Sequence, residues 1–247
     1  MGKVKIKRKS TLIDMTAMSD VTVLLLTFFM LTSTFLQKEP VTVLTPSSVS
    51  EEKVPISNLA SILVSPNGQV FISILGDADE ETKDLYGSEA IRAEVLEKAV
   101  GEWNRLHPGK KVNLTKDQVT AFSKMNMFGV PFSQLEKFLS LKQTEQDEFF
   151  NNEFKKEKET GKTSTAIGIP IDDNRNLDTP NEFQIWMRAI YNSDNENLRK
   201  AMKKGEGIAV KADKGTEYQT VHYVLDNLQT LKLNRFSIMT ALKTEQD

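Results

Sequence analysis

"GIAVKADKGTEYQTVHYVLDNLQTLKLNRFSIMT", residues 207–240, contains the clearest succession of secondary-structure patterns in the chain. The segment "IAVKA" alternates as a β-strand does, and "RFSIMT" alternates in the same way. Between these segments, apolar side chains recur at helical spacing, at Tyr218, Val221, Leu225, Leu228 and Leu231. The stretch therefore predicts a strand, a helix and a second strand, and we expect an α+β domain around this unit.

The composition allows a folded domain of ordinary size and an additional segment, because the chain has 247 residues of which 39% are apolar. The formal net charge is −2, but five cations and no acid lie within residues 1–13. The rest of the chain is therefore acidic, which excludes nucleic-acid binding by the chain as a whole. We expect residues 1–12 to be a basic arm on the cytoplasmic side of a membrane.

The residue types needed for common catalytic and metal sites are scarce. The chain has no cysteine, which excludes disulfides, thiolate catalysis and cysteine-ligated metals, and it has two histidines, His107 and His222. A nucleophile elbow, a Walker glycine loop and histidine-carboxylate spacing typical of a metal site are all missing from the sequence. We therefore expect neither an enzyme nor a protein that holds a metal or another cofactor.

The most apolar stretch, "IDMTAMSDVTVLLLTFFMLTS" at residues 13–33, predicts a transmembrane helix over residues 13–36. Residues 21–36 carry no charge, but as a helix they reach only about 24 Å, which is less than a bilayer core of about 30 Å. The span must therefore include upstream residues, and this requirement places Asp20 inside the membrane. The excess of cations before the helix predicts a cytoplasmic N-terminus and a single-pass protein whose remainder lies outside the inner membrane.

Thr16, Asp20, Thr27 and Thr34 share one side of the predicted helix, because their spacings of four and seven residues are helical. An acid within a membrane costs about 2.5 to 3.5 kcal/mol and persists mainly at a partner interface or in a proton path. We therefore expect Asp20 to carry protons, with the three threonines forming a polar stripe near its path. A single helix cannot seal such a path, so the prediction requires a multi-span partner.

Two other interpretations of this helix remain open. A cleaved signal peptide also has a basic start and an apolar middle, and "TST" at residues 32–34 is small enough for cleavage, although an acid beside the apolar region is unusual. Alternatively, the helix is a plain anchor in which Asp20 reaches the cytoplasmic interface. The polar stripe favours the proton path over both.

After the helix, residues 37–56 predict a flexible tether rich in proline, serine and threonine. Its β-prone core contains the candidate partner-binding residues Val41, Val43, Leu44 and Pro46. An extended segment of this kind can add to the edge of a sheet through backbone hydrogen bonds, in its own domain or in a partner.

Three stretches of the chain resemble the ExbD/TolR proteins, which are single-span subunits of proton-driven inner-membrane motors. "IDMTAMSDVTVLLLTFFML" resembles the family's Thr-Pro-x-x-Asp signature and maps its essential proton-binding aspartate onto Asp20, although Ala17 stands where proline is usual. "VPISNLASILVSPNGQVFIS", residues 54–73, resembles the first two strands of the periplasmic domain, and residues 207–240 resemble its strand, Ala-Asp-Lys turn, helix and last strand.

The resemblance implies a periplasmic α+β domain over residues 57–243. The middle of the chain, at about residues 77–205, departs from the short members of the family, and its sequence patterns predict a large, mostly helical insertion. "SEAIRAEVLEKAVGEWNRL" has helical apolar spacing, and "TKDQVTAFSKMNM" begins with a Thr115/Gln118 capping box. "TPNEFQIWMRAIYN" has Pro180 in its expected first turn, and "KQTEQDEFFNNEFKKEKETGKT" predicts a charged, exposed helix that runs into a loop.

The resemblance also implies a mechanism and partners. Asp20 would bind and release protons within an ExbB-like pentamer around a dimer of this chain, and the work would reach a TonB-like protein for transport across the outer membrane. The segment from Val41 to Pro46 resembles the family's valine-x-leucine-proline segment, which is linked to gating and partner binding, although Thr45 separates Leu44 from Pro46.

Two alternatives to this motor function stay open. The first is a TolR-like role in envelope maintenance that includes contact with peptidoglycan, and the second is a membrane-anchored periplasmic binding or scaffolding module. Asp20 discriminates between a motor and a module, because a plain anchor has no need of it. The sequence leaves the cargo, the role of the insertion and the choice between protons and sodium open.

Overall fold

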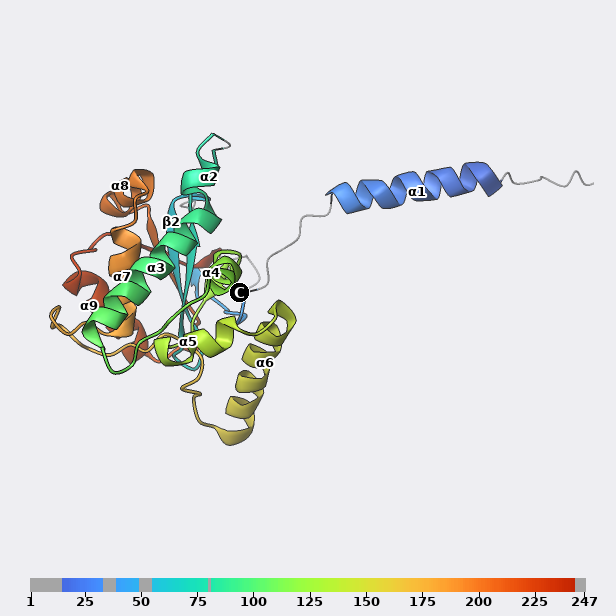
Figure 1. Cartoon of the computed structure of the whole chain (residues 1–247). Coiled ribbons are helices and arrows are strands. Elements are labelled where there is room, and N and C mark those ends of the chain that lie inside the picture. The colour runs from blue at the N-terminus through green and yellow to red at the C-terminus, as the bar shows by residue number, and fades with distance from the viewer. Residues whose placement is uncertain (1–14, 33–38, 49–54, 80, 243–247) are drawn as a thin grey trace, which may run out of the picture. The chain divides into compact units, whose positions relative to one another are not determined.

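The computed structural model describes residues 15–32, 39–48, 55–79 and 81–242. The chain divides into two units, Met1–Lys38 and Glu39–Asp247, of which the first contains helix α1 and the second contains all other described elements (Figure 1). The predicted basic arm lies outside the described residues, as do both ends of the predicted transmembrane helix, residues 13–14 and 33–36.

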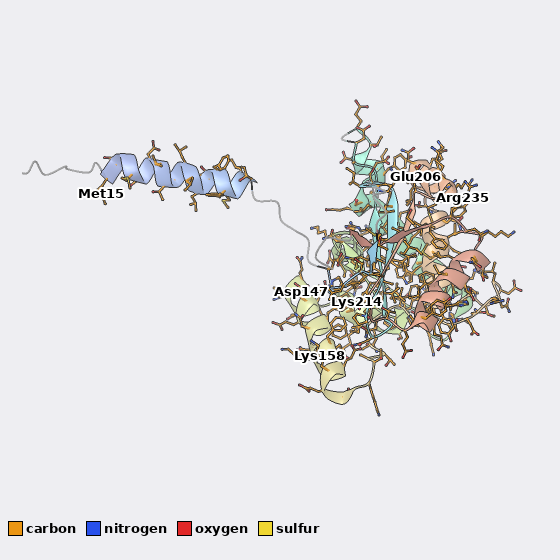
Figure 2. The ribbon with its side chains drawn as sticks, turned by 180° about the vertical axis from the view of Figure 1, so that it is seen from behind. Met15, Asp147, Lys158, Glu206, Lys214 and Arg235 are labelled. Atoms are coloured by element: carbon orange, nitrogen blue, oxygen red, sulfur yellow. The ribbon has the colours of Figure 1, made fainter. Side chains whose placement is uncertain are left out.

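Helix α1 (Met15–Thr32) covers most of the apolar stretch that the sequence analysis singles out, and its start is marked by Met15 in Figure 2. Its large apolar side chains are exposed along its length. Among the described residues, no helix is both long enough and apolar enough to span a membrane.

The main sheet of the second unit has five strands in the order β4-β3-β2-β5-β6. Strands β2 (Leu59–Val64) and β3 (Val70–Leu75) form the expected antiparallel hairpin. Gly68 in its turn has a φ of +81°, which glycine adopts without strain and which explains the "PNG" turn. The sequence prediction of two strands in residues 54–73 is therefore confirmed.

The predicted strand-helix-strand unit of residues 207–240 forms the other half of the sheet. Strand β5 (Ile208–Ala212) lies parallel to β2, helix α9 (Tyr218–Thr230) follows it, and β6 (Ser237–Met239) lies parallel to β5. The hairpin and this unit, far apart in the chain, thus build one sheet, and the second unit is an α+β domain as predicted.

Between β3 and β5, the described residues are mostly helical. The helices are α2 (Lys83–Tyr86), α3 (Ser88–Leu106), α4 (Lys116–Ser123), α5 (Phe132–Leu139), α6 (Gln143–Thr160), α7 (Glu182–Tyr191) and α8 (Glu196–Lys204). The Thr115/Gln118 capping box at α4 is present as predicted. Helix α6 is the predicted charged helix, and Asp147 and Lys158 lie toward its two ends (Figure 2).

Two helix boundaries differ from the sequence prediction. The helix expected to run through "SKMNM" ends at Ser123, because the chain turns and residues Met127–Phe128 pair with β3 as the short strand β4. Helix α7 is capped by Asn181, whose side chain accepts the backbone N–H of Gln184, so Pro180 precedes the helix and is not in its first turn. In both places a tertiary or capping interaction outweighs the local pattern.

The sheet has helices on both faces. Phe128 of β4 lies opposite Ile72 of β3, and its ring contacts Phe122 of α4 and Trp186 of α7, so α4 and α7 cover this face. Phe71 points to the other face, because side chains alternate along a strand, and its ring packs on Phe150 of α6. Helices α3 and α7 lie side by side (Figure 1).

Candidate functional site

Asp20 is an exposed side chain near the start of α1. Thr16 and Thr27 lie four residues before it and seven after it on this helix, which places the three on one side. The fourth member of the predicted stripe, Thr34, lies outside the described residues. The described part of α1 therefore presents an acid with two hydroxyl-bearing neighbours along one side of a mostly apolar helix.

Several hydroxyls of α1 bond to the helix itself. The hydroxyl of Thr27 donates to the carbonyl oxygen of Leu24 at 2.9 Å, and that of Thr22 donates to Met18 at 2.7 Å. Such bonds satisfy a hydroxyl in an apolar environment without a partner chain. An ionised carboxylate has no hydrogen to donate and cannot form such a bond, so Asp20 differs from the hydroxyl-bearing residues of this helix.

The segment of residues 39–48, which we name the strap, lies against the α+β domain. Its first described residue, Glu39, accepts hydrogen bonds from Nζ of Lys211 in β5, at 2.9 and 3.0 Å. At its other end, strand β1 (Ser47–Ser48) pairs in parallel with β7 (Ala241–Leu242), which follows β6. The strap thus binds the domain at both ends of its described length.

The centre of the strap is held by Asp213, in the turn that follows β5. The carboxylate Oδ2 of Asp213 accepts the backbone N–H of Leu44 at 2.7 Å, and the backbone N–H of Lys214 donates to the carbonyl oxygen of Leu44 at 2.8 Å. Oδ1 of Asp213 accepts the N–H of Gly215 at 2.7 Å, which fixes the carboxylate in the turn. Both backbone groups of Leu44 are therefore paired, as they would be in a strand.

The candidate partner-binding residues of the strap take different positions. Val43 is 8% exposed and belongs to the core, and Val41 is half-buried against it. Leu44 is 60% exposed and Pro46 is also exposed. Val43 therefore anchors the strap, whereas Leu44 offers its side chain to the surroundings while its backbone is held.

Sequence reasoning singled out the strap residues but not the residues that hold them. Asp213 belongs to the turn "ADK", whose place between a strand and a helix is predicted, but no local pattern indicates that its carboxylate binds a segment 169 residues earlier.

Within the described part of the chain, no group of three or more histidine, aspartate or glutamate side chains could hold a metal ion.

A family model described as biopolymer transport protein ExbD/TolR matches residues 7–243, which is nearly the whole chain and includes Asp20, the strap and the α+β domain. No curated protein and no solved structure matches the chain.

Proposed function

The chain belongs to the ExbD/TolR family, and from this membership we propose that it is an ExbD-like subunit of an inner-membrane motor in which Asp20 couples proton flow to transport across the outer membrane. Proteins of this family are inner-membrane anchored, non-enzymatic subunits that transduce energy for biopolymer transport. The observation that carries the proposal is the acid of α1 within a segment that the family model matches.

In this proposal α1 is the core of a single-pass membrane helix with a cytoplasmic N-terminus. The charge-free sequence continues past the end of α1 to Leu36, and the cations lie before it. Asp20 binds and releases protons within a pentamer of ExbB-like multi-span subunits around a dimer of this chain, and Thr16, Thr27 and Thr34 lie beside its path. One proton that crosses 100 mV releases about 2.3 kcal/mol, which is comparable to the cost of placing the carboxylate in lipid.

The strap provides the mechanical link of this motor to the periplasmic domain. It follows α1 in the chain after six residues, 33–38, so a displacement of the helix is transmitted to the domain through it. The strap is fixed by the pairing of Leu44 with Asp213 and Lys214, by the ion pair of Glu39 with Lys211 and by strand β1. The exposed Leu44 and Pro46 are then available to a TonB-like protein.

The decisive experiment compares Asp20→Asn with Thr22→Val, a control whose hydroxyl bonds to the carbonyl oxygen of Met18 away from the polar stripe, in cells that depend on this chain for energised uptake across the outer membrane. Expression and co-purification of the ExbB-like partner are measured alongside. Loss of uptake in Asp20→Asn, with the complex intact and with uptake retained in Thr22→Val, supports the motor. Unchanged uptake in Asp20→Asn would instead favour a membrane-anchored scaffolding module of TolR-like function, in which the helix is a plain anchor.

A further inference from the structure

A small cavity lies where helices α8 and α9 end. Its volume is about 200 Å³, and its lining comes from three segments: Tyr191 at the end of α7, Met202 and Lys203 in α8, and residues 232–235, which come after α9. We call it the basic cavity, because its lining includes the exposed cations Lys203, Lys232 and Arg235 and no acid.

The three cations of the basic cavity have no acidic partner within the described part of the chain, where none of them forms an ion pair. Arg235 lies beside the end of α8, because a Cβ at Gly205 would lie 2.9 Å from the Cβ of Arg235 (Figure 2). The next residue, Glu206, is exposed and does not pair with these cations. The fold therefore gathers three positive charges, from two separate segments of the chain, around one cavity.

The ends of the two helices explain part of this positive charge. The C-terminal end of a helix carries a charge of about −0.5 and attracts cations, and Lys203 lies in the last turn of α8. Two such ends supply about one negative charge, so about two of the three positive charges remain uncompensated. At α8, moreover, the carbonyl oxygen of Ala201 already accepts the backbone N–H groups of residues 205–207. The helix ends therefore do not account for the whole cluster.

Lys232 occupies a position at which glycine is usual. Its φ is +62°, and its backbone N–H donates to the carbonyl oxygen of Gln229 at 2.9 Å. The next amide, of Leu233, donates to Leu228 at 2.8 Å, which completes the hydrogen-bond pattern of a Schellman motif at the end of α9. Glycine adopts this conformation without strain, as Gly205 does at the end of α8 with a φ of +97°. The turn itself has no need of a lysine, and residues held in such conformations cluster at ligand sites.

We propose that the basic cavity binds a phosphate group, either free or carried as a monoester by a larger molecule. A phosphate monoester has a charge of about −1.5 to −2 at neutral pH, which matches the excess of about two positive charges. The guanidinium of Arg235 can donate two parallel hydrogen bonds to its oxygens, and Lys203 and Lys232 provide point charges. A carboxylate has a single charge and would leave about one positive charge over. The cavity lies wholly within the α+β domain, so the inference goes beyond the proposed motor function and does not depend on Asp20.

The test measures phosphate binding by phosphorus NMR of the probe, with the full-length chain in maltoside micelles, which contain no phosphorus. Inorganic phosphate is titrated at about pH 7.5, and sodium chloride keeps the ionic strength constant, because salt screens charges at a surface. Lys232→Gly and Arg235→Gln each remove one charge from the basic cavity. The matched control, Lys204→Gln, removes the exposed lysine next to Lys203, which does not line the cavity. Glycerol phosphate and acetate are compared as competitors.

We expect saturable broadening of the phosphate resonance, with an affinity about two- to fivefold weaker in Lys232→Gly and in Arg235→Gln and unchanged in Lys204→Gln. Lys232→Gly should also unfold at a higher urea concentration than the native chain, so that its weaker binding cannot arise from a damaged fold. Tighter binding of glycerol phosphate than of inorganic phosphate would identify an ester as the ligand, and the reverse order would identify the free ion.

Three results would overturn the proposal. The first is the absence of saturable binding in the native chain. The second is an affinity in Lys232→Gly and Arg235→Gln equal to that in Lys204→Gln, which would show that the bound phosphate does not occupy the basic cavity. The third is competition by acetate as strong as that by phosphate, which would show that the cavity does not select a phosphate group.

Discussion

The carboxylate of Asp213 holds the backbone amide of Leu44 at 2.7 Å and so fastens the strap to the turn between β5 and α9. The same carboxylate accepts the amide of Gly215 at 2.7 Å. An aspartate can serve both donors because each oxygen accepts one of them. At Leu44, therefore, one oxygen of Asp213 holds the strap while the other fixes the side chain in its own turn.

Asp213→Asn should release the centre of the strap. Asparagine has one carbonyl oxygen, so one of the two amides faces an NH₂ group and loses a charge-assisted hydrogen bond of about 1.5 to 3 kcal/mol. We expect hydrogen exchange at the amides of Leu44 and Lys214 to accelerate by about tenfold to a hundredfold. The control is Asp173→Asn, an exposed aspartate in the loop before α7, which should leave both rates unchanged. Equal protection of Leu44 in the Asp213 variant and the native chain would contradict this role.

Whether a feature of this region could be predicted from the sequence depends on how far apart the interacting residues lie along the chain. The hairpin of β2 and β3 and the unit of β5, α9 and β6 were predictable because alternation and helical spacing are local properties. The contact of Leu44 with Asp213 was not, since it joins residues 169 apart and no periodicity records it. Strand β4 was missed because two residues, Met127–Phe128, are too few to alternate. Asp20 was singled out because a lone acid in an apolar run is a local anomaly, and its role in proton transfer stays a prediction.

Glu157→Ala should detach the end of α6 from the hairpin. The carboxylate of Glu157 is nearly fully buried and accepts hydrogen bonds from the side-chain amides of Asn67 and Gln69 and from the backbone N–H of Ser164. Its removal leaves these donors without their acceptor, and we expect the free energy of unfolding to fall by about 2 to 4 kcal/mol. Urea denaturation measures the loss. The matched control Glu159→Ala removes an exposed glutamate of the same helix and should change stability by less than about 0.5 kcal/mol.

Two glycine substitutions should have opposite effects on stability. A Cβ at Gly129 would lie 2.3 Å from the ring of Phe71, which itself packs on Phe150, so Gly129→Ala should destabilise the domain by about 1 to 3 kcal/mol. A Cβ at Gly101, in the exposed middle of α3, would meet nothing within 4 Å. Gly101→Ala should therefore stabilise the domain by about 0.5 to 1 kcal/mol through helix propensity and a less disordered unfolded state.

Thermal or urea unfolding of both variants decides between these expectations. The explanation for Gly129 can be tested further with Phe71→Leu, because a smaller side chain makes room for the added methyl group. The double variant should then be more stable than the sum of the two single losses predicts. Strict additivity would show that the loss in Gly129→Ala does not arise from the ring of Phe71.

The stability of the domain should fall as the pH rises through about 7, owing to Glu182. Burial in the folded state raises the pKa of this carboxyl from 4.5 to about 7, so folding favours its neutral form. Its contribution is fully present below pH 4.5 and is lost progressively as the pH rises through 7. With about 1.4 kcal/mol for each pH unit between these values, the loss amounts to about 3 kcal/mol.

Urea unfolding at half-unit steps from about pH 5 to about pH 8 measures this loss of stability. Glu182→Gln should flatten this part of the profile, because glutamine stays neutral and can still accept the N–H of Phe132. An equally steep decline in Glu182→Gln would assign the dependence to another group.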